Sequence, residues 1–272
     1  MFWRKTVLII AILSILIFIY NYIQISKPYI NKVNIKSNKI DKKLRLTQIS
    51  DFHSNKYINL DKLFKNIKEY NPDIILLTGD LIDYKTTDLK LALDLIKRTK
   101  EITPHVYFVA GNHENRNVKY PILANNMKKL GVTILNNESK TLDINGEKLN
   151  IAGVEFQLNR KEYTNVLNNI NPNYFTLLLS HSPNRPIKYL TGKEDLILSG
   201  HTHGGQVRLP IVGAILAPGQ GLFPKHDKGI VQVGNTTLYI DSGLGNSVYP
   251  IRLFNRVQIS NIMMSTVFKN VP

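Results

Sequence analysis

Residues 196–205 have the sequence LILSGHTHGG. The apolar run at the start predicts a buried strand that ends at Gly200. Because alternate residues of an extended backbone point to the same side, we expect His201 and His203 to reach toward one place. Neutral imidazole is the commonest protein ligand of transition metals, although most His-x-His pairs are ordinary polar residues at the end of a strand.

Four other apolar runs, at 44–50, 74–78, 106–110 and 176–179, are followed at once by polar residues of the same kind. These residues are Asp51 and His53, Gly79 and Asp80, the run Gly111-Asn112-His113-Glu114, and Ser180 and His181. Five of the seven histidines of the chain fall in these five segments. Each feature has a simpler explanation by itself, such as a helix cap or a turn. Together they predict one metal centre, because the carboxyl ends of strands form the crevice in which α/β proteins bind ligands.

The residue types predict the chemistry of this centre. Two neighbouring divalent cations repel each other and need a bridging carboxylate, for which Asp80 is the central candidate. The other candidate ligands are Asp51, His53, Asn112, His181, His201 and His203. Oxygen and imidazole ligands without sulfur suit two Mn, Fe or Zn ions better than Mg alone. Two such ions about 3.5–4 Å apart can share a water, lower its pKa and clamp a phosphate group, and His113 is placed to protonate or stabilise the leaving oxygen.

The N-terminus contains a long uncharged segment. No charged residue occurs between residues 6 and 26, and about 20 helical residues at about 1.5 Å each cross a hydrocarbon layer of about 30 Å. The sequence therefore predicts a transmembrane anchor over 6–26 behind a short flank at 1–5. Aromatic residues typical of membrane interfaces lie at both edges, namely Trp3, Tyr20, Tyr22 and Tyr29. A cleaved signal peptide is the alternative, but residues 20–24, YNYIQ, offer no small-residue cleavage site.

The charges beside this anchor leave its orientation open. Arg4 and Lys5 favour a cytoplasmic N-terminus, whereas six lysines between residues 27 and 43 favour the opposite orientation. Large domains can be exported despite such charge, and we expect a single-pass protein of the cell membrane whose catalytic domain is extracytoplasmic. Residues 27–43 are polar, basic and short of large apolar side chains, which predicts a stalk.

The composition limits the partners of the protein. The 272 residues carry a formal net charge of +15, spread along the chain, which indicates either a solvated basic surface or attraction to anionic lipid, wall polymer or phosphorylated substrate. We expect no nucleic acid, because no basic and aromatic recognition module is visible, and we infer no obligate protein partner. The absence of cysteine excludes disulfides and thiolate metal sites.

Beyond residue 43, predicted strands and helices alternate in a single domain over 44–272. Apolar periodicity predicts helices at 60–70, 88–100 and 121–130, and Asn-Gly or Gly-Asn turns predict hairpins at 141–151 and 230–240. Residues 213–228 are rich in glycine and proline and form either a substrate lid or an ordinary surface loop. The pattern favours a mixed α/β domain whose sheets are covered by helices.

The ordered motifs Asp-x-His, Gly-Asp, Gly-Asn-His-Glu, His and Gly-His-Thr-His resemble the calcineurin-like metallophosphoesterase family over residues from about 44 to 260. Residues 200–206, 242–245 and 250–252 resemble a branch of membrane-associated or exported bacterial phosphodiesterases. The resemblance implies a four-layer α/β/β/α sandwich. It further implies one metal on Asp51, His53, Asp80 and His203, and a second on Asp80, Asn112, His181 and His201.

The resemblance also assigns roles to the residues beside the ligands. It implies that His113 is the catalytic histidine and that the next carboxylate, Glu114, orients it. Glu114 stands where the family usually has aspartate, and Phe52 stands where the branch often has leucine.

The sequence supports three functions to different degrees. The first is a metal-dependent hydrolase of phosphodiester or pyrophosphate bonds in an envelope- or lipid-linked substrate. The second is a phosphomonoesterase with the same metal chemistry, which the motifs do not distinguish from the first. The third is a non-catalytic metal-binding scaffold, which predicts gaps in the ligand set or loss of His113, and the chain has neither.

Overall fold

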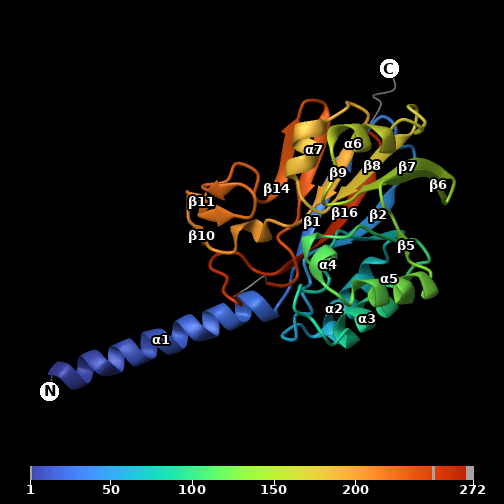
Figure 1. Cartoon of the computed structure of the whole chain (residues 1–272). Coiled ribbons are helices and arrows are strands. Elements are labelled where there is room, and N and C mark those ends of the chain that lie inside the picture. The colour runs from blue at the N-terminus through green and yellow to red at the C-terminus, as the bar shows by residue number, and fades with distance from the viewer. Residues whose placement is uncertain (1, 247–248, 268–272) are drawn as a thin grey trace.

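The computed structural model describes residues 2–246 and 249–267, which include two six-stranded sheets stacked face to face (Figure 1). The first sheet has the strand order β1-β16-β2-β3-β4-β5. Its strands are β1 (Tyr29–Lys36), β2 (Leu44–Ile49), β3 (Ile74–Leu77), β4 (Val106–Phe108), β5 (Thr133–Ile134) and β16 (Gln258–Ser265). Strands β2 to β5 are parallel, and β16 lies antiparallel to β2 and parallel to β1.

The second sheet has the strand order β14-β15-β9-β8-β7-β6. Its strands are β6 (Glu138–Ile144), β7 (Glu147–Val154), β8 (Phe175–Ser180), β9 (Leu196–Ser199), β14 (Gly229–Val233) and β15 (Thr236–Ile240). The four central strands are parallel, and an antiparallel hairpin closes each edge. Both hairpins are those predicted from their Asn-Gly and Gly-Asn turns.

Helices cover the outer face of each sheet. Three of them, α2 (Leu60–Tyr70), α3 (Lys90–Lys100) and α5 (Tyr120–Lys129), bury their apolar faces against the first sheet. Two shorter ones, α6 (Arg160–Val166) and α7 (Asn184–Tyr189), cover the second sheet. A separate core, which includes Leu46, Leu76 and Leu198, fills the space between the sheets. The predicted four-layer α/β/β/α sandwich is confirmed.

The segment predicted as a stalk is partly built into the fold, so that prediction is wrong for residues 29–36. These residues form β1, which pairs with β16 along its whole length. Val33 and Ile35 are buried between the sheets, while the residues that alternate with them remain accessible. An edge strand with two core side chains among polar neighbours has too few apolar residues to be distinguished from a linker.

Helix α1 (Phe2–Ser26) projects away from the sandwich as one continuous rod (Figure 1). By length and composition it is the one helix of the described residues that could cross a membrane. The most apolar 18 residues of this helix are not buried in the molecule. The C-terminal end of α1 is attached to the domain, since the side-chain amide of Asn21 donates to Pro250 O at 2.9 Å. The limits 6–26 for the membrane segment stay a prediction.

Several short elements lie outside the predictions. Residues after β9 form a 3₁₀ turn, η1 (His203–Gly205), and two small hairpins. The hairpins consist of β10 (Arg208–Leu209) with β11 (Gly213–Ala214), and β12 (Leu216–Ala217) with β13 (Gly221–Leu222). A five-residue helix, α4 (Asn112–Arg116), follows β4. The strands of both hairpins have two residues each and α4 has five, too few for a period to be visible in the sequence.

Candidate metal centre

The polar segments that follow β2, β3, β4, β8 and β9 converge where the two sheets meet. Asp51 N donates to Gly79 O at 2.9 Å, and Gly200 N donates to His181 O at 2.9 Å. The backbone N–H of His201 donates to both carboxylate oxygens of Asp51, at 3.0 and 3.1 Å, and so joins the two sheets. The convergence predicted from the sequence is therefore present.

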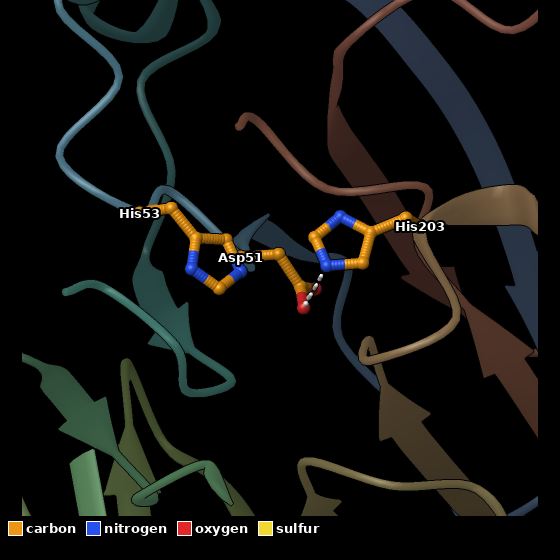
Figure 2. Close-up of side chains that lie close together, drawn as sticks. All are labelled: Asp51, His53 and His203. Atoms are coloured by element: carbon orange, nitrogen blue, oxygen red, sulfur yellow. Dashed lines mark ion pairs between the residues drawn. The ribbon is translucent and has the colours of Figure 1, made fainter. Parts of the chain in front are cut away.

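Asp51, His53 and His203 form the first group of ligand-type side chains (Figure 2). Their ligand atoms lie within 4.8 Å of one another, and His203 Nε2 is 3.6 Å from Asp51 Oδ1. Burial lowers the pKa of His53 to about 4 and holds that of His203 well below its usual range. Both imidazoles are therefore neutral at pH 7, which is the form that binds metal.

Asp80, His181 and His201 form the second group. His181 Nε2 lies 3.1 Å from Asp80 Oδ2 and 3.2 Å from His201 Nδ1, while its Nδ1 contacts Thr78 O at 2.8 Å. Because a carbonyl can only accept, Nδ1 carries the proton, and Nε2 faces the carboxylate. Burial opposes a charged His181, but the adjacent Asp80 outweighs it and raises the pKa of His181 to about 10. The Asp80 carboxylate thus favours a positive charge at His181 Nε2, a position that either a proton or a metal ion can occupy.

Asp80 belongs to the second group and also lies close to His53 of the first group. Its Oδ2 is 3.1 Å from His181 Nε2 and 3.8 Å from His53 Nε2, and its Oδ1 accepts a hydrogen bond from His113 N at 2.9 Å. Burial by itself would raise the pKa of Asp80, but the imidazoles around it, His181 above all, hold that pKa well below its usual range. An ionised carboxylate shared by both groups is what a bridging ligand requires.

Buried atoms without hydrogen-bond partners test whether this cluster fits metal ions. Among the described residues, both ring nitrogens of His53, Nδ1 of His203 and Oδ1 of Asn112 are buried without a partner. Such unpaired buried atoms cost free energy, about 1–3 kcal/mol each, unless a ligand satisfies them. The rings of His53 and His203 lie beside Asp80 and Asp51, and the nitrogen and oxygen donor set fits divalent transition metals.

The backbone conformation at the centre differs from the extended geometry expected for 201–203. His201 and His203 have φ values of 71° and 51°, in the left-handed region, and they enter different groups rather than one place. Asp51, His53 and Asp80 also have positive φ values. For non-glycine residues this conformation costs on the order of 1–3 kcal/mol each and is concentrated at functional sites. The tight turns aim each side chain back toward the sheet ends.

Glycines in the motifs provide space for the carboxylates. A Cβ atom on Gly111 would overlap the Asp80 carboxylate, and one on Gly200 would overlap Ser50 and the Asp51 carboxylate. These two positions therefore require glycine for close approach rather than for flexibility.

His113 faces the centre and has a carboxylate partner that the sequence reasoning missed. Its Nε2 is 3.9 Å from Asp80 Oδ2, and its Nδ1 is 3.2 Å from Asp83 Oδ2. The residue after Asp83 is Tyr84, whose backbone N–H donates a hydrogen bond to His113 Nδ1 at 3.1 Å. The available signal was an acidic residue three positions after Asp80 in the same loop.

The expectation that Glu114 orients the His113 ring is wrong. The Glu114 carboxylate accepts four backbone N–H groups, from Asp80 at 2.7 Å, Leu81 at 2.7 Å, Ile82 at 3.2 Å and Gly111 at 2.8 Å. Glu114 is fully buried and holds the loop that carries Asp80 against the loop that carries Asn112. The carboxylate beside the His113 ring belongs to Asp83 instead.

Replacing Glu114 by glutamine is expected to destabilise the protein. One amide oxygen can no longer serve all four donors, and the new NH₂ group faces backbone N–H groups, at a cost of about 1–3 kcal/mol. Urea unfolding of the detergent-solubilised full chain measures this loss, with the exposed Glu138→Gln as the matched control. Equal unfolding free energies for Glu114→Gln and Glu138→Gln would show that Glu114 does not hold the two loops together.

Arg252 supports the loop that packs on Asp51, a role that was not predicted from the sequence. Its buried guanidinium donates to Ser242 O at 2.8 Å, Gly245 O at 2.6 Å and Asn246 Oδ1 at 3.0 Å. The loop that it holds packs directly on Asp51, because Gly245 N donates to Asp51 O at 2.6 Å. Residues 242–245 and 250–252 are thereby explained as one structural unit.

Comparisons with known proteins agree with this geometry. A family model described as calcineurin-like phosphoesterase matches residues 44–205. The uncharacterized metallophosphoesterase YkuE of Bacillus subtilis is 30% identical over 79% of this chain and 77% of its own length. A bovine transmembrane protein with metallophosphoesterase domain is 28% identical over 81% of this chain, which spans only 53% of that protein.

A solved structure supports the fold alone. The sulfate thiohydrolase SoxB of Thermus thermophilus, in complex with glycerol, superposes with a TM-score of 0.51 at 11% sequence identity. The match covers 90% of this chain and 58% of SoxB.

Proposed function

Because the chain belongs to the calcineurin-like phosphoesterase family, we propose that it is a membrane-anchored hydrolase that uses two divalent metal ions to cleave phosphodiester or pyrophosphate bonds. The observation that carries this proposal is the convergence of two groups of ligand-type side chains on one shared carboxylate, Asp80. The substrate that we propose is a phosphorylated small molecule or lipid of the cell envelope.

The proposed ligand sets extend the first group by Asp80 and the second group by Asn112. Asp51, His53, Asp80 and His203 would hold one ion, and Asp80, Asn112, His181 and His201 would hold the other. When bound, such ions supply Lewis-acid activation of water and neutralise the charge of the phosphate. Mn, Fe and Zn all suit this donor set.

The chain's own residues supply proton transfer and orientation. His113 Nε2 is directed toward the centre, where it would donate a proton to the leaving oxygen. The backbone N–H of Tyr84 donates to the other ring nitrogen, Nδ1, and the Asp83 carboxylate lies 3.2 Å from the same nitrogen. Asp83 is therefore proposed as a positioning residue for His113.

We also propose that α1 anchors the protein in the membrane with the catalytic domain outside the cytoplasm. Arg4 and Lys5, which precede the apolar segment, support a cytoplasmic N-terminus. Protease treatment of intact cells would remove the domain in this orientation, and complete protection would overturn it.

Hydrolysis of model substrates by the full chain tests the proposed reaction. The detergent-solubilised protein, loaded with Mn²⁺ or Zn²⁺, is expected to hydrolyse bis(p-nitrophenyl) phosphate, to lose this activity with a chelator and to regain it with metal. Hydrolysis of p-nitrophenyl phosphate alone would replace the diesterase assignment by a phosphomonoesterase. Failure of verified metal-loaded protein on both substrates would contradict an enzyme and favour the non-catalytic scaffold.

A further inference from the structure

Exposed apolar side chains outside α1 are concentrated in two segments. In the described part of the chain, more than half of the large exposed hydrophobic residues beyond α1 lie at 209–223 or 249–254. They are Leu209, Ile211, Val212, Leu216, Leu222, Phe223, Tyr249, Ile251 and Phe254. Water-exposed apolar residues at this density are typical of a surface that contacts lipid or protein. We call these nine residues the apolar rim.

The apolar rim adjoins the end of α1. The ring of Phe254 contacts that of Tyr20 with centroids 6.0 Å apart, and Phe254 N donates to the Tyr20 hydroxyl at 3.0 Å. Arg252 N donates to Asn21 Oδ1 at 2.9 Å, so the connection does not depend on one contact. A bridge between Val207 and Leu253 joins the two segments of the rim. The exposed apolar surface of α1 therefore continues onto the domain.

The small hairpins lie on the same side of the domain as α1. In Figure 1, β10 and β11 lie on the side of the sandwich from which α1 projects, whereas α5 lies on the opposite side. Ile211, at the tip of the β10–β11 hairpin, is fully exposed and has a φ of 72°. A β-branched residue is strained in this conformation, and the exposure of its side chain to water is a further cost.

The rim is attached to the metal centre. Thr202, between the two histidines of the motif, donates to Asp227 O at 2.6 Å. The Arg208 guanidinium bridges Gly204 O at 2.9 Å and the Asp227 carboxylate at 2.6 Å. A pocket of about 660 Å³ lies between these parts and is lined by Thr202, Gln206, Val207, Ile215, Leu216 and Pro218 among others. The rim and the histidine turn are therefore directly connected through Thr202, Arg208 and Asp227.

We propose that the apolar rim inserts into the surface of the lipid bilayer that α1 spans. Lipid is the occupant that fits, because the rim extends an apolar helix of membrane-spanning length and because exposed Lys225 stands two residues after Phe223. Apolar side chains with an adjacent basic residue bind the boundary between acyl chains and anionic head groups. The contact would hold the pocket beside the histidine turn at the membrane surface.

Site-specific labels on the full chain test this contact directly. The protein has no cysteine, so Ile211→Cys and Phe223→Cys each give one attachment point for a fluorophore. Ile122→Cys is the matched control, since Ile122 is 49% exposed, similar to Phe223 at 62%, but lies on α5. Each labelled protein is reconstituted into phosphatidylcholine–phosphatidylglycerol vesicles, with and without doxyl-labelled lipid, after its unfolding midpoint has been matched to the unmodified chain.

Doxyl lipid is expected to quench the labels at 211 and 223 several-fold more strongly than the label at 122. The same labels should be shielded from aqueous iodide in vesicles, whereas the label at 122 should remain accessible. Equal quenching at all three positions would overturn the proposal. Shielding from iodide without quenching by doxyl lipid would also overturn it, because another copy of the chain, rather than lipid, would then cover the rim. The readout does not involve hydrolysis, so its failure leaves the proposed function intact.

Discussion

Asp80→Asn is expected to abolish hydrolysis and to lower the metal content of the protein at the same time. Its carboxylate is the one shared by both groups, with Oδ2 3.1 Å from His181 and 3.8 Å from His53. Loss of this charge leaves two neighbouring cations without the anion that separates them. Because even indirect support of a metal ligand is worth about 10–100-fold in affinity or activity, removal of a bridging ligand should reduce activity by at least about 100-fold.

The metal content of the variant is measured together with its activity, because the prediction is that both are lost. Atomic emission of the purified variant, after equilibration with Mn²⁺ and removal of free metal, should show fewer ions per chain than the unmodified protein. Asp61→Asn is the matched control, since the Asp61 side chain is 84% exposed on α2, pairs with Arg98 and belongs to neither group. Asp80→Asn protein that keeps both ions and ordinary turnover would contradict the bridging role.

His113→Ala is expected to retain both metal ions and to lose most turnover. The ring lies beside the ligands without belonging to either proposed set, and general acid catalysis is typically worth about 10²–10⁴-fold. The loss should be largest for a diester with a poor alkoxide leaving group, which needs a proton, and smallest for a nitrophenolate. Steady-state rates on two diesters that differ only in the leaving group measure this split.

Asp83→Asn tests the same assignment through the partner of the ring. The variant should share the leaving-group dependence of His113→Ala with a smaller loss, because the ring remains but its Nδ1 faces an amide. In the double variant, Asp83→Asn should add little to His113→Ala, as expected for residues that act as a unit. Loss of metal from His113→Ala, or an equal loss on both diesters, would show that His113 acts as a ligand or a structural residue.

The central strands of the fold were predictable because each has a strong local signal. The runs at β3, β8 and β9 are apolar, short and bounded by glycine or polar residues, and they lie buried in the middle of their sheets. Strand β1 was missed because pairing with β16, more than 200 residues away, stabilises it rather than its own composition. The small hairpins after β9 were missed for a different reason, since strands of two residues are too short to show a period.

The residue types at the centre were predictable, but their partners were not. Six of the seven predicted metal ligands, all except Asn112, lie in the two groups, because each follows a strand whose carboxyl end points there. The separation of His201 from His203 depends on left-handed backbone conformations that no sequence period reports. The position of Asp83, rather than Glu114, beside the His113 ring depends on the fold of two loops that meet only in the tertiary structure.

The central claim is that two metal ions share Asp80. Crystals of the full chain equilibrated with Mn²⁺ test it through anomalous diffraction at the manganese edge. We predict two anomalous peaks about 3.5–4 Å apart, with the Asp80 carboxylate in contact with both. A single peak, or two peaks of which only one contacts Asp80, would contradict the account.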